Sequence, residues 1–240
     1  MRHVRTRSRP RRHAKRHARR SGRRRSRRNT RPYTSSITVP GRSLFPNKLF
    51  TKLYYEDYFV VTMVAGVLNN FIYRGNSCFD PDNWSAGGGH QPFLYDQYVA
   101  LYGLCTVLAC KMKATVRSYA SATPAYGSQW FLSTYKDALV PSDITEDPRS
   151  IQKFAGTYFN FQPVHLSSYA KTATLFGVND DEVTGDYRSY AHSSTANPTL
   201  GWSFRLNGYS FSVASTDSFV VEFRQTFYCM FTQPVVQVQG

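Results

Sequence analysis

The sequence has no long apolar run. Its longest runs, Val60–Leu68 and Val99–Cys110, are interrupted by Thr, Tyr or Gly and fall well short of the roughly 20 apolar residues that a membrane-spanning helix requires. The N-terminal region has neither the apolar stretch of a secretory signal nor the apolar helical face of a mitochondrial transit peptide. We therefore expect no membrane insertion and no secretory leader.

Cysteine is scarce, and its spacing predicts no metal site. The 240 residues contain four Cys, and no two of them form the C-x-x-C pair of a zinc ribbon. Cys110 and Cys229 fall on the apolar side of predicted strands, where a thiol acts as a small hydrophobe. We expect free thiols in a reducing compartment, and neither a metal nor a cofactor. The sequon Asn83-Trp84-Ser85 is interpreted as a chance match, because no secretory signal accompanies it.

Side chains that carry catalysis are also few. Beyond the N-terminal region there are three histidines, His90, His165 and His192, and none has a partner at the spacing of a metal-binding motif such as H-E-x-x-H. Gly87–Gly89 is followed by no Gly-Lys-Ser/Thr, which favours a flexible loop over a phosphate loop. The carboxylates of Asp80-Pro81-Asp82 could act as an acid–base pair, but Asp-Pro favours a turn. We predict that the protein is not an enzyme.

Acidic residues are absent from the first 31 residues, and basic residues are concentrated there. This segment carries 16 of the 30 Lys and Arg residues, which leaves 30 − 16 = 14 basic residues against all 15 acidic ones in the remainder. The formal charge of +15 therefore belongs to an N-terminal arm. The basic residues of this arm are Arg2, Arg5, Arg7, Arg9, Arg11, Arg12, Lys15, Arg16, Arg19, Arg20, Arg23, Arg24, Arg25, Arg27, Arg28 and Arg31.

The arm has too few apolar residues to fold by itself. Met1, Val4, Ala14 and Ala18 cannot offset the entropy cost of ordering it, and its like charges repel one another. A guanidinium group pairs with phosphates and also stacks on unpaired bases. We predict a disordered arm that binds nucleic acid, preferably single-stranded. A nuclear localisation signal alone is the alternative, and one basic segment can serve both roles.

The rest of the sequence is typical of a β protein. A linker of residues 32–46 precedes a single predicted domain of residues 47–240. In Val107–Ser118 the apolar residues occupy even positions, and in Phe219–Phe231 they recur opposite Glu222 and Arg224. Further β-prone segments are Leu53–Val67, Gln129–Tyr135, Gln152–Phe161 and the alternating Trp202–Asn207. Many strands with few helices predict an all-β sandwich or jelly roll.

Helices are expected only in loops. One is predicted to begin at Asp96, as its N-cap, and to end at Gly103, and a weaker one lies around Ser142–Asp147. Asp180–Glu182 is interpreted as a solvated loop. Asn207-Gly208, flanked by alternating apolar residues, predicts a hairpin or a bulge that would split the segment around it into two strands.

One block of sequence resembles a known family. Phe71–Asp82 contains the loop pattern N-x-x-x-D-P-D, which is followed by Gly-His-Gln-Pro, then by Tyr-Asp-Gln-Tyr at Tyr95–Tyr98, and then by the basic-faced strand Val107–Ser118. This order resembles the capsid proteins of small circular single-stranded DNA viruses of the circovirus and cyclovirus kind. The specific motif covers about residues 71–118, and the rest matches in layout. Cys105 and Cys110 depart from the polar or aromatic residues expected there.

The resemblance implies a fold and a function. It implies a single eight-stranded viral jelly roll behind the arm, a homo-oligomeric icosahedral shell of sixty subunits, and a packaged single-stranded DNA genome. It also implies virion and host-nucleus localisation through the nuclear import machinery, and it leaves the receptor unknown. It favours one continuous strand, and not a hairpin, at Asn207-Gly208.

Within this resemblance the motif residues have structural roles. We predict that Asn76, Asp80 and Asp82 accept hydrogen bonds from backbone amides and so fix their loop. The helix at Asp96 is predicted to pack Tyr98 and Tyr102 onto the sandwich. The other motif residues are Pro81, His90, Gln91 and Pro92.

Lys111, Lys113 and Arg117 share one polar strand face. Contact with packaged DNA and a solvated face with subunit salt bridges are both open explanations. A cellular nucleic-acid-binding protein, whose β domain docks on a complex, explains the arm equally well but not the motif block. A glycan-binding sandwich is a third hypothesis, and Trp84, Trp130 and Trp202 are its only support.

Overall fold

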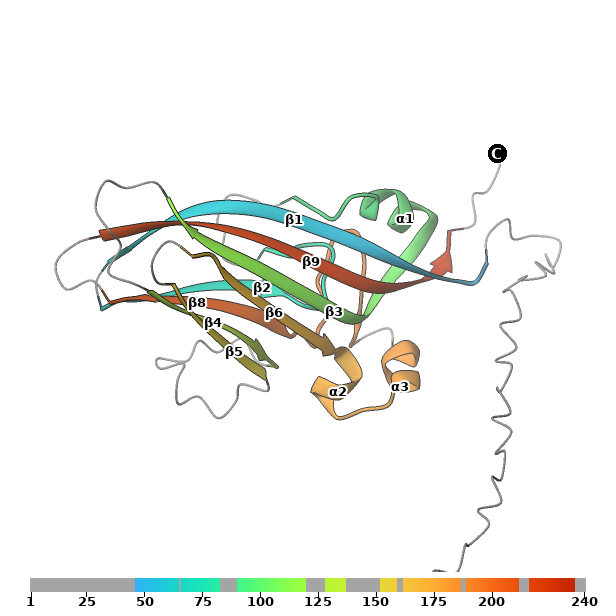
Figure 1. Ribbon diagram of the computed structural model, residues 1–240. Coiled ribbons are helices and arrows are strands. Elements are labelled where there is room, and N and C mark those ends of the chain that lie inside the picture. The colour runs from blue at the N-terminus through green and yellow to red at the C-terminus, as the bar shows by residue number, and fades with distance from the viewer. Residues whose placement is uncertain are drawn as a thin grey trace, which may run out of the picture. The chain divides into compact units, whose positions relative to one another are not determined.

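The computed structural model describes residues 46–64, 66–82, 90–119, 128–136, 152–158, 162–186, 189–211 and 216–235 (Figure 1). All of them belong to one unit, Val39–Gly240. The predictions for the arm, for most of the linker, for Asn83–Ser85, for Gly87–Gly89 and for a helix near Ser142–Asp147 lie outside the described residues.

Strands dominate the described part of the chain. They are β1 (Lys48–Val64), β2 (Leu68–Arg74), β3 (Tyr102–Ser118), β4 (Ser128–Tyr135), β5 (Gln152–Tyr158), β6 (Val164–Lys171), β7 (Ala191–His192), β8 (Ser203–Ser210) and β9 (Thr216–Pro234). The helices are α1 (Tyr95–Leu101), α2 (Thr172–Phe176) and α3 (Asp180–Gly185). Among the described helices, none is long and apolar enough to cross a membrane.

The strands form two antiparallel sheets. One has the order β1-β9-β3-β6, with the two-residue β7 paired to β3, and the other has the order β2-β8-β4-β5. The chain passes repeatedly from one sheet to the other, and its last strand lies between the first and the third (Figure 1). Eight main strands in this order make a double-sheet jelly roll. The predicted fold class is confirmed.

The core lies between the two sheets. On β9 the predicted face is buried throughout, from Phe219 to Phe231. The rings of Trp130 on β4 and Phe219 on β9 meet edge to face, with 5.7 Å between their centroids. Each fully buried large apolar side chain contributes about 1.5–3 kcal/mol, so this aromatic layer holds the sheets together.

The predicted alternation of buried and exposed residues along β3 holds only in the second half of the strand. Cys110, Met112, Ala114 and Val116 are buried and Lys113 and Arg117 exposed, as predicted. The pairing of β3 with β9 shifts between Val107 and Ala109, which marks a β-bulge. Before the bulge Cys105 and Val107 belong to the main core, whereas Leu108 packs against the smaller cluster of Ala173, Val183 and Tyr190, so the buried even positions do not extend to Leu108.

The predicted hairpin at Asn207-Gly208 is also wrong. β8 is continuous, and Asn207 and Gly208 pair with β2 on one side and with β4 on the other. A Cβ atom on Gly208 would lie 2.8 Å from Met63 Sδ and from the Trp130 ring, so this glycine makes room for two core side chains. Arg205 and Asn207, on the opposite face of β8, are fully buried as well. The continuous strand agrees with the family resemblance.

The helices differ in part from expectation. α1 exists, but its N-cap residue is Leu94, and Asp96 lies in the first turn and makes no capping hydrogen bond. The helix ends at Leu101 and leads directly into β3, so Gly103 is a strand residue and not a helix stop. Asp180–Glu182 forms the first turn of α3 behind Asn179, and not a loop. The three acidic side chains are solvated, as predicted, and they favour a helix start through the helix dipole.

All four cysteines are buried and free. Cys110 and Cys229 face the core, as predicted. Burial raises the pKa of the Cys78, Cys105 and Cys110 thiols. Burial acts in the same direction on Cys229, but hydrogen bonds from Cys105 and Cys78 outweigh it and lower its pKa to about 6. Three cysteines that are far apart in the sequence are thus neighbours in the fold.

Candidate functional site

The loop of residues 75–82, called the motif loop below, follows β2 and is fixed by two kinds of contact. The first is made by Asn76, which is 1% exposed. Its Oδ1 accepts a hydrogen bond from the Trp202 amide at 3.0 Å, and its Nδ2 donates to the Leu200 carbonyl at 2.7 Å. The predicted role of Asn76 is confirmed.

Gly75 allows this loop to lie against Trp202. The Gly75 amide donates to the Trp202 carbonyl at 2.8 Å. A Cβ atom at Gly75 would lie 2.0 Å from the Trp202 ring, so no other residue fits without moving the indole. Ser77 Oγ donates to Asn197 Oδ1 at 2.6 Å and ties the loop to the same neighbouring segment.

The second contact is an ion pair. The Arg74 guanidinium pairs with the Asp80 carboxylate and also donates to the Asp80 carbonyl at 3.0 Å. Asp80 therefore holds the loop through Arg74, and the prediction that its partner is a backbone amide is wrong. The N-x-x-x-D-P-D pattern suggested partners within the loop, whereas Arg74 is the last residue of β2. The Arg74 amide adds a bond to the Pro81 carbonyl at 2.8 Å, which closes the loop.

Asp82 is nearly buried, and its backbone forms an isolated bridge with Tyr73. Its carboxylate lies close to Tyr55. Burial, followed by the negative charges of Asp82, Asp57 and Asp80, raises the pKa of Tyr55 well above its usual range. The Tyr55 phenol therefore stays neutral, and the ring of His90 lies 4.6 Å from it.

The segment after the Gly-rich stretch connects the motif loop to α1. Gln91 Nε2 donates to the Phe79 carbonyl at 3.0 Å, and the Pro92 carbonyl accepts from the Tyr95 amide at 3.0 Å. Tyr98 of α1 lies 5.2 Å from the Phe231 ring, which confirms that the helix packs this ring onto the sandwich. Tyr102 lies 6.2 Å from the same ring but belongs to β3, so the prediction that the helix carries it is wrong. The motif residues thus form one connected scaffold.

Charged side chains gather on the outer face of the β1-β9-β3-β6 sheet. Register places seven basic residues there against Glu56 and Glu222, for a formal charge of 7 − 2 = +5. We call this set the basic face; it consists of Lys48, Lys52, Lys111, Lys113, Arg117, Lys171 and Arg224.

Two of these cations are neutralised within the sheet. Arg117 lies 3.2 Å from Glu222, and Arg224 pairs with Glu56. Among the described residues Lys111 and Lys113 have no carboxylate within ion-pair distance. The three candidates of the sequence therefore differ, and Arg117 has a structural partner of its own.

Aromatic and aliphatic side chains stand beside the basic face. On β1 they alternate with Lys52, Glu56 and Thr62 and point to the same side. We call them the β1 strip; its members are Phe50, Tyr54, Tyr58, Val60 and Val64, with Tyr58 71% exposed. Basic groups with interleaved aromatic rings suit single-stranded nucleic acid, and an exposed apolar strip suits a protein interface. The alternation that predicts this strip lies within Leu53–Val67, but sequence alone does not tell which of its faces is buried.

A cavity of about 650 Å³ opens beside the motif loop. Its lining includes Arg74, Lys136, Asn76 and Trp202. Arg74 is neutralised by Asp80, and Trp202 is 2% exposed. Lys136 Nζ lies 5.3 Å from the centroid of the Phe176 ring, which also lines the cavity.

Comparison with known proteins gives structural neighbours only. No family model and no curated protein matches the sequence. The structure is similar to that of desmodium yellow mottle tymovirus, with 12% identity, 82% of this chain and 91% of that chain covered, and a TM-score of 0.38.

For two further neighbours, the match covers the whole of the neighbour's chain. The BFDV capsid protein in a 60-mer has 11% identity, 82% and 100% coverage and a TM-score of 0.37. A virus-like particle of the giant freshwater prawn Macrobrachium rosenbergii nodavirus has 10% identity, 82% and 100% coverage and a TM-score of 0.42. The fold assignment rests on the strand order of this chain and not on these values.

Proposed function

We propose that this protein is the capsid protein of a small virus. A single jelly roll, joined in one chain to an acid-free arginine-rich arm, is the observation that supports this proposal most strongly. A jelly roll leaves its loops and outer sheet faces free for contacts with neighbouring subunits, and the β1 strip is an exposed apolar surface of that kind. The protein would act as a shell subunit and not as an enzyme.

The cargo follows from the charge. In a shell of sixty subunits the arms would contribute 60 × 16 = 960 positive charges, enough to balance about a kilobase of single-stranded nucleic acid. Residues 71–118 resemble the circovirus and cyclovirus motif, which favours single-stranded DNA as the genome. The arm would also serve as the nuclear entry signal, so assembly would take place in the host nucleus.

Two rival functions explain less of the chain. A cellular nucleic-acid-binding protein accounts for the arm but not for the connected motif scaffold or the β1 strip. A glycan-binding sandwich needs exposed tryptophans, and Trp130 and Trp202 are buried at 0% and 2% exposure. Trp84 lies outside the described residues.

Electron microscopy of the purified full-length protein, beside a variant lacking residues 1–31, tests the proposal. We expect uniform closed particles with a high ratio of absorbance at 260 to 280 nm from the full-length chain. The truncated variant should form particles with protein-like absorbance, because it keeps the shell and loses the arm. A monomer or small oligomer at every salt concentration would instead support the cellular nucleic-acid-binding protein.

A further inference from the structure

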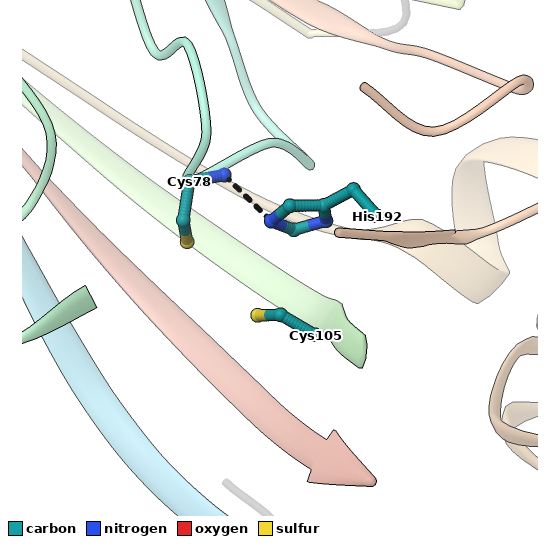
Figure 2. Close-up of side chains that lie close together, drawn as sticks. All are labelled: Cys78, Cys105 and His192. Carbon is teal, nitrogen blue, oxygen red and sulfur yellow. Dashed lines mark hydrogen bonds between the residues drawn. The ribbon is translucent and has the colours of Figure 1, made fainter. Parts of the chain in front are cut away.

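Three cysteines and one histidine meet inside the sandwich. Cys78 comes from the motif loop, Cys105 from β3, His192 from β7 and Cys229 from β9. Figure 2 shows the side chains of Cys78, Cys105 and His192 converging on one space. The spacing of these residues in the sequence fits no metal motif. The order of the strands in the fold brings them together.

The distances suit a tetrahedral metal ion. The ligand atoms of Cys78, Cys105 and His192 all lie within 4.8 Å of one another, and Cys78 Sγ lies 3.5 Å from Cys229 Sγ. Zinc with Zn–S bonds of about 2.3 Å and Zn–N bonds of about 2.0 Å places its ligand atoms roughly 3.5–3.8 Å apart. The separations among Cys78, Cys105 and His192 therefore exceed these values by at most about 1.3 Å, and Cys229 meets them at Cys78.

The surroundings exclude water and leave one nitrogen of the His192 ring without a hydrogen-bond partner among the described residues. Cys78 and Cys105 are 0% exposed, Cys229 is 1% and His192 is 2%. The Cys78 amide donates to His192 Nε2 at 3.0 Å, so Nε2 is the unprotonated nitrogen of a neutral ring (Figure 2). His192 Nδ1 is buried and has no hydrogen-bond partner among the described residues. An imidazole that is buried beside the Cys78 and Cys105 thiols and has one unsatisfied nitrogen is unfavourable as a purely packed group.

We propose that Cys78, Cys105, His192 and Cys229 form a structural zinc site. Three thiolates and one imidazole make a closed Cys₃His set with no open position for substrate, which is typical of zinc that stabilises a fold. On binding, each thiol that still carries its proton loses it to solvent as an S–Zn bond forms. The site would join the motif loop and β7 to β3 and β9, and it does not depend on the proposed capsid function.

Zinc content measured by mass spectrometry on the full-length protein, after dialysis into metal-free buffer, tests the site. Cys105→Ala and Cys110→Ala are matched variants, because both residues lie on β3, both are fully buried and only Cys105 belongs to the cluster. We expect about one zinc ion per chain in the wild type and in Cys110→Ala, and less than about a tenth of that in Cys105→Ala. His3, His13 and His17 of the arm can bind zinc weakly, so the difference between the two variants is the measurement that decides. No zinc in the wild type, or equal zinc in both variants, would overturn the proposal.

A second measurement does not rely on the variants folding. Cobalt(II) exchanged into the wild-type protein should give intense thiolate-to-cobalt charge-transfer absorption and the visible bands of a tetrahedral ion. A chelator should lower the melting temperature of the zinc-loaded protein by roughly 5 °C or more, and zinc should restore it. The contrary result is octahedral cobalt without charge transfer. A Cys78–Cys229 disulfide, detected as two missing thiols in the denatured protein, would also contradict the site.

Discussion

Gly208 shows how a residue that a local pattern assigns to a turn can serve packing instead. Gly208→Ala would place a Cβ atom 2.8 Å from Met63 Sδ and from the Trp130 ring. We expect the free energy of unfolding to fall by about 1–3 kcal/mol, as for other overpacked cores, measured by urea unfolding of the variant lacking residues 1–31. Gly201→Ala is the control, because nothing lies within 4 Å of its added Cβ atom. Equal stability of the two variants would contradict the packing role.

The motif loop shows which single-residue roles the sequence can predict. Asn76 was predictable because a short amide side chain in a loop has few uses other than pairing with nearby backbone groups, and it does so. Asp80 was not, because its partner Arg74 lies at the end of a strand that the sequence pattern does not reveal. The contacts among Cys78, Cys105 and His192 were unpredictable for the same reason, since they depend on the order of strands across a sheet.

At the scale of elements, the position of Asp96 within α1 predicts a smaller effect on stability than a capping role would give. Asp96 lies in the first turn and makes no capping bond, so it acts only through the helix dipole. We expect Asp96→Asn to lower stability by about 0.3–1 kcal/mol at low salt and by less at high salt, measured by thermal unfolding. An effect that salt does not reduce would restore the hydrogen-bonding role.

Elements with clear alternation were predictable, and the short or polar ones were not. β9 and the second half of β3 follow the apolar period of their sequences, whereas β4 was predicted from β-prone residues and is buried on both faces. β6 has a buried face made of Val164, Leu166, Ser168 and Ala170, and it was missed because two of these four side chains are small. The bulge in β3 left no mark in the sequence, because both registers place apolar residues in the core.

The basic face makes a prediction for the β1-β9-β3-β6 sheet as a unit. Within the part of the chain that the structure describes, Lys111 and Lys113 have no carboxylate partner, whereas Arg117 contacts Glu222. In the variant lacking residues 1–31, Lys111→Gln with Lys113→Gln should weaken binding of single-stranded DNA and reduce the slope of log K against log salt by about 1.4, from two lost phosphate contacts. Binding can be followed by fluorescence anisotropy of a labelled oligothymidine.

Arg117→Gln in the same truncated protein is the matched control, and it should alter the slope by less than the loss of one lysine would. Slopes that no variant changes would assign the basic face to solvent or to subunit salt bridges, which is the alternative that the sequence leaves open.

At the scale of the whole molecule, charge and shape are divided between different parts of the chain. The first 31 residues contain 16 basic residues and no acidic ones, whereas the remaining 209 residues are nearly neutral. A domain that is nearly neutral can associate with copies of itself without strong repulsion, while the charge of the arm remains available for the nucleic acid that we propose it binds. This division is readable from the sequence alone, because it needs no knowledge of the fold.

The surface through which copies would associate is the last prediction. Tyr58 and Tyr54 of the β1 strip are 71% and 51% exposed, so they add little to the stability of one subunit. Tyr54→Ser with Tyr58→Ser should leave the melting temperature of the unassembled protein within about 2 °C of the wild type. It should also lower particle yield at least tenfold in sucrose-gradient sedimentation, because the interface loses two aromatic anchors. Tyr119→Ser is the control, since Tyr119 is 53% exposed outside the strip and should keep full assembly. Normal particle yield from the double variant would show that subunits meet through another face.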